Sequence, residues 1–267
     1  MYNDALRDLS LAGVQWEITE LPTAAAAALA AAEREAAKIA PAAPKTAADD
    51  IQIPDSARTP VYSSGPVVVP RIAPISVETA AAAAARPTDT DAMLRMISEF
   101  NHPLRATAHN TVLPHVAKNP NGLLIITDIP GADDDMAGKI LTGGAGELLD
   151  KMIGAIGMSR ENVSIMPVLF WRTPGGRAPS RGELDLCRPF VDHMVDLLAP
   201  RVIITMGTLA ATEIAHVDLA KSHGVATEIA GRTVMPIFHP NYLLLKPAAK
   251  RDAWNALQAV QNMLKNA

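Results

Sequence analysis

The chain has 267 residues, of which 49% are hydrophobic and 4% aromatic, and its formal net charge is −4. This length allows one sizeable core, or one domain with a long tail. The single cysteine, Cys187, excludes an internal disulfide framework and any metal site built from several cysteines of this chain. We therefore expect a cytoplasmic protein. We also expect no secretory signal and no membrane contact, because acidic residues stand near the start and no run of about 18 apolar residues occurs.

The first third of the chain is acidic and low in complexity. Residues 1–100 hold eight basic and 13 acidic residues, so this part does not attract nucleic acid by charge. Apolar residues within 1–20, between Leu6 and Trp16, predict a short amphipathic helix. It is interpreted either as a peptide that docks a protein partner or as a frayed terminal helix. Residues 21–93 are rich in Ala and Pro, bury little apolar surface, and are interpreted as a flexible, disordered linker.

In residues 94–267, patterns typical of strands alternate with patterns typical of helices, as in a folded domain. In chain order, the patterns predict strands at 123–129, 163–170 and 201–206, helices at 145–156, 181–198 and 208–216, a strand pair at 225–229 and 233–238, and a closing helix at 254–264. Ser180 and Glu183 form a capping box that begins the second helix. The alternation predicts an α/β fold with a mostly parallel sheet covered by helices on both faces.

Three loops follow predicted strands, and in a parallel sheet such loops meet at the edge where ligands bind. The first contains Asp128 and a Pro130-Gly131 turn, followed by the acidic triple 133–135. The second is the Gly-rich loop 172–177, and the third begins at His239. Taken singly, each has an ordinary explanation, such as a loop cap for Asp128 or a structural role for His239. The acidic triple is interpreted as a solvated loop, with a magnesium site as the alternative.

Taken together and in order, the loops resemble family four of the uracil-DNA glycosylase superfamily. Residues 127–150 have the sequence T-D-I-P-G-A-D-D-D-M-A-G-K-I-L-T-G-G-A-G-E-L-L-D, which aligns without a gap to the family's G-E-A-P-G-A-x-E-D-x-x-G-x-P-F-V-G-x-x-G-x-L-L-D. Residues 166–179, 186–190, 200–207 and 239–245 match four further family segments. The resemblance implies the family's fold, which has three layers (α/β/α) around a central, mostly parallel four-stranded sheet. It also implies DNA as the partner and hydrolysis of the N-glycosidic bond of uracil or a related damaged base.

The resemblance also assigns roles to residues of this chain. Asp128 takes the position of the acidic residue that helps to position water, and His239 that of the donor to the leaving base. Ile129, Pro130 and Gly131 line the expected base pocket. The family's uracil-stacking Phe falls at Leu141 and its edge-reading Asn at Pro167, so both contacts are replaced. We therefore expect a pocket with altered base preference or weak activity.

The remaining expectations concern DNA contact and cofactors. Arg172, Gly175, Gly176 and Arg177 of the second loop, and Leu244, Leu245 and Lys246 of the third, are candidate DNA-binding residues, with a solvated face or docking onto the closing helix as the alternatives. The cluster-binding cysteines of many family members are missing, since His102 and Trp171 stand in their regions and Cys187 alone remains. No cofactor is expected, and the protein is expected to be a monomer.

Three functional hypotheses stay open at this point. The first is a divergent glycosylase that uses Asp128 and His239. The second is a non-catalytic DNA-binding accessory protein on a degenerate glycosylase scaffold. The third is a binder of a free nucleotide or another small ligand.

Overall fold

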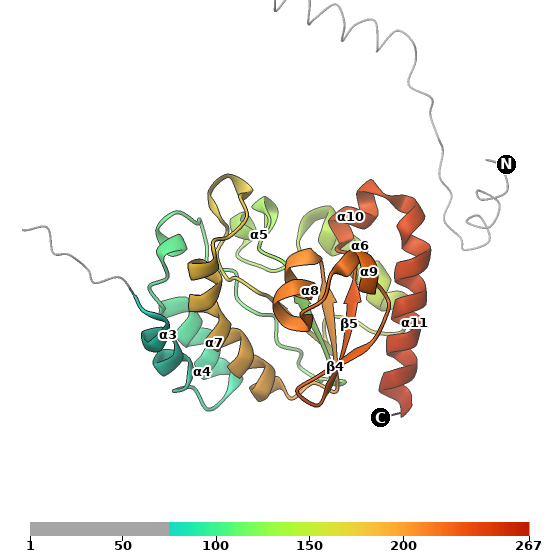
Figure 1. The fold of residues 1–267 in the computed structure, drawn as a ribbon, viewed down its shortest axis with the longest axis horizontal. Helices are drawn as coiled ribbons and strands as arrows, with labels where there is room; N and C mark the ends of the chain where they lie inside the picture. The colour runs from blue at the N-terminus through green and yellow to red at the C-terminus, as the bar shows by residue number, and fades with distance from the viewer. Residues whose placement is uncertain (1–74, 267) are drawn as a thin grey trace, which may run out of the picture. The chain divides into compact units, whose positions relative to one another are not determined.

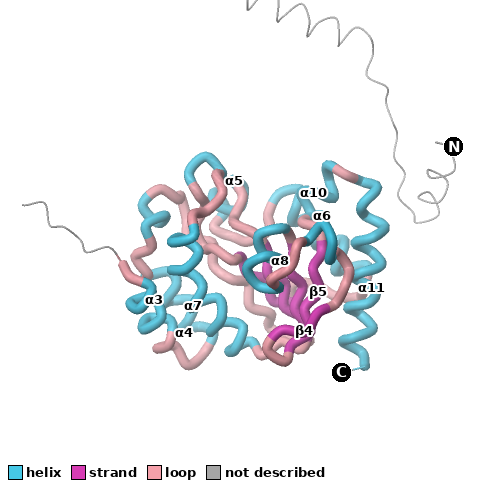
Figure 2. Tube along the Cα trace, in the orientation of Figure 1, coloured by secondary structure: helices cyan, strands magenta, loops and turns pink. Residues whose placement is uncertain are grey.

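The computed structural model describes residues 75–266, all of which belong to one structural unit, 70–267. The amphipathic helix predicted within 1–20, and the part of the predicted linker up to residue 74, lie outside the described residues. The described part places strands between two layers of helices (Figure 2). The predicted α/β class with three layers is therefore confirmed.

A five-stranded sheet forms the middle layer. Its strands are β1 (Leu123–Thr127), β2 (Val163–Pro167), β3 (Val202–Met206), β4 (Thr227–Ile229) and β5 (Arg232–Ile237), in the order β2-β1-β3-β5-β4. The first four in this order are parallel, and β4 pairs antiparallel with β5. The strand pair predicted at 225–229 and 233–238 is confirmed as β4 and β5, so the sheet has five strands, one more than the four expected in the central sheet. The pair forms a tight hairpin because Ala230 and Gly231 both have positive φ, as a two-residue hairpin turn requires.

Helices cover both faces of the sheet (Figure 1). On one side the sheet shares a core with α7 (Arg181–Leu198) and α8 (Thr208–Ala215), and α3 (Val77–Ala84) and α4 (Thr90–Glu99) pack against α7. The other face packs against α6 (Gly143–Ala155), α10 (Pro240–Leu245) and α11 (Lys250–Asn266). Successive strand residues alternate between the two cores, as Leu124 and Leu123 do. None of the helices within residues 75–266 combines the length and apolarity that a membrane span needs.

The connections carry shorter elements. They are η2 (Pro103–Ala106), α5 (Ala132–Ala137), η3 (Pro174–Gly176), α9 (Leu219–Ser222) and η4 (Pro247–Ala249). The capping box predicted for α7 is present, because the Ser180 side chain accepts the N–H of Glu183, whose carboxylate accepts the N–H of Ser180. This capping box therefore fixes the residue at which the loop 172–179 ends and α7 begins.

Helical structure begins before residue 94, within the stretch interpreted as linker. Ser76 caps α3 and Asp89 caps α4. Ala80 and Ala84 are buried, and α3 packs against α7, because small side chains let two helices approach closely. The alanine-rich composition that suggested a linker here serves helix packing instead.

Candidate active site

The carboxyl ends of four parallel strands lie level at one edge of the sheet. Thr127 is in register with Pro167 on β2 and with Met206 on β3, and Met206 is in register with Ile237 on β5. Asp128 follows β1 directly, and His239 follows β5 by two residues. Since β3 lies between these strands, their axes are about 10 Å apart. The fold therefore brings the first and third predicted loops to the same edge, across the end of β3.

Asp128 points at the start of α8. Its Oδ1 accepts the backbone N–H of Ala210 at 2.8 Å, and the N–H groups of Thr208 and Leu209 also stabilise the carboxylate. Gly207, with φ 111°, begins this turn, and a Cβ there would collide with the Asp128 carboxylate. Burial raises the pKa of Asp128 to about 6, against the lowering effect of these hydrogen bonds. Asp128 is therefore a half-buried carboxylate that remains mostly ionised at neutral pH.

His239 is the N-cap of α10. Its Nδ1 accepts the N–H of Asn241 at 3.1 Å, so in the neutral ring the proton lies on Nε2. Burial lowers the pKa of His239 to about 4, and the charge of Asp134 opposes this shift. The imidazole is therefore neutral at physiological pH, with Nε2–H available as a donor.

The acidic triple after Gly131 forms the first turn of α5. Asp134 and Asp135 are both buried, and both accept backbone N–H groups. Asp133 is exposed. Across residues 75–266, no three His, Cys, Asp or Glu side chains are grouped so that they could hold a metal ion. The solvated-loop interpretation therefore fits Asp133 alone, since the other two carboxylates accept hydrogen bonds within the protein.

The residues predicted to line the base pocket differ in exposure. Gly131 is exposed, Ile129 is half-buried, and Pro130 and Pro167 are buried. Leu141 is 2% exposed and packs in the core that includes α6, α10 and α11, with a positive φ of 51°. In this arrangement the Leu141 side chain packs with the core instead of presenting an open stacking face.

Arg160 holds the loop that carries Leu141. Its guanidinium donates to the carbonyls of Ile140 at 3.0 Å and Leu141 at 2.6 Å, and it pairs with Asp150 at 2.7 Å. Gly146 allows this arrangement, because a Cβ there would collide with the Leu141 carbonyl oxygen. Arg160 was not among the predicted site residues, because no sequence motif around it indicates a contact with a loop about 20 residues earlier.

The larger cavity among those described lies next to this edge and not within it. Its volume is about 440 Å³, and it is lined by Ala220, His223, Gly224, Phe238, Asp252, Asn255 and Ala256. Phe238 precedes His239, and its ring lies 4.0 Å from the ring of His223 and 4.7 Å from that of Tyr242. None of the residues predicted to line the base pocket contributes to this cavity.

The candidate DNA-binding residues fall into two groups. Gly175, Gly176, Leu245 and Lys246 are exposed, Leu244 is 45% exposed, and Arg172 is half-buried without an ion-pair partner among residues 75–266. Arg177 instead forms a two-pronged ion pair with Glu183, at 2.5 and 2.9 Å. This pair lowers the pKa of Glu183 to about 2 and connects the loop to the start of α7. Arg177 therefore has a structural partner that the sequence interpretation did not include.

Comparison with known proteins identifies the family. The family model described as Uracil DNA glycosylase superfamily matches residues 114–258, more than half of the chain. The chain belongs to this superfamily. Type-4 uracil-DNA glycosylases of Archaeoglobus fulgidus and Pyrobaculum aerophilum are each 30% identical to it over 159 and 160 residues, which is 56% of this chain and 79% and 81% of theirs. A DNA polymerase of Bacillus phage SP01 is 27% identical over 127 residues, 47% of this chain and 14% of the polymerase.

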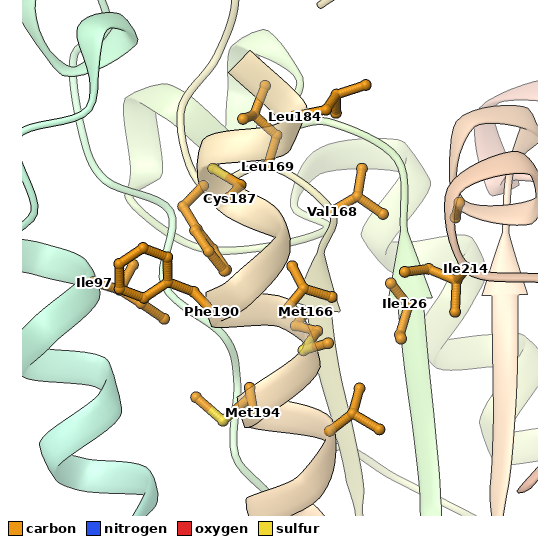
Figure 3. Close-up of a cluster of buried hydrophobic side chains, with 14 of the residues drawn as sticks. Ile97, Ile126, Met166, Val168, Leu169, Leu184, Cys187, Phe190, Met194 and Ile214 are labelled. Carbon is orange, nitrogen blue, oxygen red and sulfur yellow. The ribbon is translucent and has the colours of Figure 1, made fainter. Parts of the chain in front are cut away.

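The side chains at the superfamily's cluster region do not fit an iron–sulfur cluster. The His102 ring stacks on Trp171 at 4.8 Å, its Nδ1 accepts the N–H of Leu104, and its Nε2 donates to the carbonyl of Glu183. Cys187 lies in a packed apolar cluster with Leu169 and Phe190 (Figure 3), and burial raises the pKa of its thiol to about 12. A cluster needs several thiolate ligands, whereas this region offers one buried thiol and a histidine whose nitrogens are both occupied.

Proposed function

We propose that this protein is a divergent uracil-DNA glycosylase that hydrolyses the N-glycosidic bond of uracil, or of a related damaged base, in DNA. The superfamily match and the type-4 relatives support a uracil-DNA glycosylase-like function. The observation that carries the proposal is a neutral His239 and an ionised Asp128, both half-buried, at the same edge of the sheet. A neutral histidine can donate a hydrogen bond to the departing base anion, and an ionised carboxylate can accept one from the attacking water.

His239 is proposed to stabilise the leaving base. Breaking the bond leaves negative charge on the base, and a preorganised donor directed at that charge lowers the barrier. The Asn241 N–H holds Nδ1 as an acceptor and so directs Nε2–H outward as the donor. Because the ring is already neutral, no proton has to leave it before the reaction.

Asp128 is proposed to orient the attacking water and to offset positive charge on the sugar. Its hydrogen bonds to the start of α8 fix the direction of the carboxylate, and an ionised carboxylate has lone pairs left to accept from a water. Aspartate is one methylene shorter than the family's glutamate. The position of that water, and with it the rate, therefore depends on where the turn at Gly207 places this side chain.

The pocket substitutions are proposed to change base selectivity. Pro167 has no side-chain hydrogen bond to offer a base edge, and the loss of a two-point amide contact removes about 1–3 kcal/mol of discrimination. Leu141 replaces the stacking ring with an aliphatic side chain that packs in the core. We expect weaker selection of uracil over related bases than a pocket with Phe and Asn would give.

The second candidate is a non-catalytic DNA-binding accessory protein. It is favoured by the position of Leu141 and by the similarity to 14% of a phage DNA polymerase. In this alternative the exposed Gly-rich loop and the end of α10 contact DNA without base removal. A cytoplasmic monomer that acts on DNA, and that binds a protein partner through residues 1–20, remains part of either proposal.

Uracil-containing oligonucleotides, single- and double-stranded, separate the two functions. The first predicts abasic sites after incubation, and at least about 100-fold less cleavage with His239→Ala, because one lost donor to a developing oxyanion costs about that much. His216→Ala is the control, since His216 is an exposed histidine that ends α8. Retardation of DNA in a gel without any abasic sites would reject the enzyme and support the accessory protein.

A further inference from the structure

Asp134 is a buried carboxylate that the roles described above leave unused. It is 7% exposed and lies in the first turn of α5. Its Oδ2 accepts the N–H of Gly131 at 3.1 Å, as part of the capping of α5. Its Oδ1 accepts both the N–H of Thr142 at 2.7 Å and the Thr142 hydroxyl at 2.8 Å.

These contacts extend beyond the needs of a helix cap. The Gly131 contact satisfies the start of α5, whereas both Thr142 contacts reach a loop that follows α5 and precedes α6. That loop contains Leu141, and Gly131 ends the turn that follows Asp128. One carboxylate thus connects the two loops that carry the predicted pocket residues.

The third site loop is also within the influence of Asp134. Of the charged side chains, it is Asp134 that acts on His239, where it favours the protonated ring and offsets part of the effect of burial on the pKa. The packing of α10 against α6 brings His239 towards the loop that Asp134 holds. Asp134 therefore joins the loops of Gly131 and Leu141 by hydrogen bonds, and the loop of His239 lies within range of its charge.

We propose that Asp134 is a positioning residue of the active site, which holds the Gly131 and Leu141 loops in the arrangement that places a bound base opposite His239. This inference rests on the proposed glycosylase function. Asp134 itself does not touch the base. Its removal lets the two loops separate while α5 and the rest of the sheet edge remain.

The neighbouring residue provides a matched control. Asp135 has the same 7% exposure and the same helix, and its Oδ1 also accepts two backbone N–H groups, at 2.9 and 3.0 Å. Those groups belong to His109 and Asn110, which lie outside the three site loops. Loss of either carboxylate removes comparable hydrogen bonds, but only the loss of Asp134 disconnects the site.

The test compares Asp134→Ala, Asp134→Asn and Asp135→Ala in the full-length protein, with a uracil-containing single-stranded oligonucleotide. We expect the two alanine variants to lose similar thermal stability. We also expect Asp134→Ala to lose about 100-fold in kcat, the effect of a displacement of about 1 Å at a reacting group, while Asp135→Ala keeps the wild-type kcat. Asp134→Asn keeps an oxygen for Thr142 and should recover most of kcat. Equal kcat in the two alanine variants, or an Asn variant as slow as Asp134→Ala, overturns the proposal.

A second measurement does not depend on catalysis. The imidazole signals of His239 in an NMR spectrum at neutral pH, assigned with His239→Asn, should move in Asp134→Ala and stay in place in Asp135→Ala. Unmoved His239 signals in Asp134→Ala overturn the inference. Wild-type protein that excises no base, but whose His239 signals respond to Asp134→Ala, refutes the proposed function and leaves the positioning role standing.

Discussion

Asp128 occupies an environment that disfavours its own charge. The carboxylate is half-buried at the sheet edge, and the N–H groups at the start of α8 replace part of the solvation that it loses. A site that keeps such a group carries a cost in stability, which is common where a charge serves a reaction. The raised pKa therefore gives a stability effect with a defined direction.

We predict that Asp128→Asn stabilises the protein at high pH and not at low pH. The pKa of Asp128 is about 6 in the folded chain and 3.8 without the fold, so between these values the folded state binds more protons. Wild-type stability therefore falls as pH rises through this window, by up to about 3 kcal/mol. Asparagine has no charge to bury and keeps an oxygen for the Ala210 N–H.

Urea unfolding at pH 5, 6 and 8 measures this effect. The stabilisation by Asp128→Asn should be largest at pH 8 and shrink towards pH 5, while base excision is lost. Asp133→Asn, an exposed change in the same loop, should leave stability unchanged at each pH. The same stabilisation by Asp128→Asn at pH 5 and pH 8 would show that the carboxylate is not desolvated.

Sequence patterns located some residues of this site and not others. Asp128 and His239 stand in motifs after apolar strands, so their place at the sheet edge followed from the alternation of strands and helices. The connecting role of Asp134 and the contact of Arg160 with Leu141 depend on loops that approach only after folding. No local pattern encodes such approaches, which is why the acidic triple looked like a solvated loop.

The longer elements were predictable because they repeat a period several times. The helix α7 and the strands β1, β2 and β3 were found to within a few residues. Missed were α3 and α4, whose alanine-rich surroundings suggested a linker, and also α5 and α10, which have six residues each and complete fewer than two turns. The N-cap residues of α5 and α10 are Gly131 and His239. Both were predicted to be loop residues with functional roles.

The turn into α8 gives a prediction for Gly207. Alanine there adds a Cβ that collides with the Asp128 carboxylate, in addition to the strain of a residue at φ 111°. We expect Gly207→Ala to lose about 1–3 kcal/mol from the backbone, because φ 111° with ψ 168° is a conformation that essentially only glycine adopts, and about 1–3 kcal/mol more from the collision. Excision should fall with it, because Asp128 has to move.

Gly157→Ala separates strain from collision. Gly157 also has a positive φ, of 75°, but a Cβ there would meet no atom within 4 Å. This variant should therefore show the backbone loss alone, in urea unfolding at pH 8, and keep its excision rate. Equal losses in the two variants would mean that Asp128 does not occupy the space beside Gly207.

At the scale of the whole molecule, two separate cores hold the sheet from its two sides. One contains α7 with α3, α4 and α8, and the other contains α6, α10 and α11. The site residues come from loops on both sides, so neither core alone positions them. The first core also includes residues before the family match, which begins at residue 114.

The start of the folded domain gives the last prediction. A chain that begins at residue 94 lacks α3 and the first turn of α4, and so loses Ala80, Ala84 and Met93, all of them buried. Loss of Met93 alone exposes core surface worth about 2–5 kcal/mol. We expect the 94–267 chain to unfold at a clearly lower urea concentration than the full chain. A chain of residues 75–267 keeps both described cores and should unfold at a clearly higher urea concentration than 94–267. Equal concentrations for these two chains would show that α3 and the first turn of α4 do not stabilise the domain.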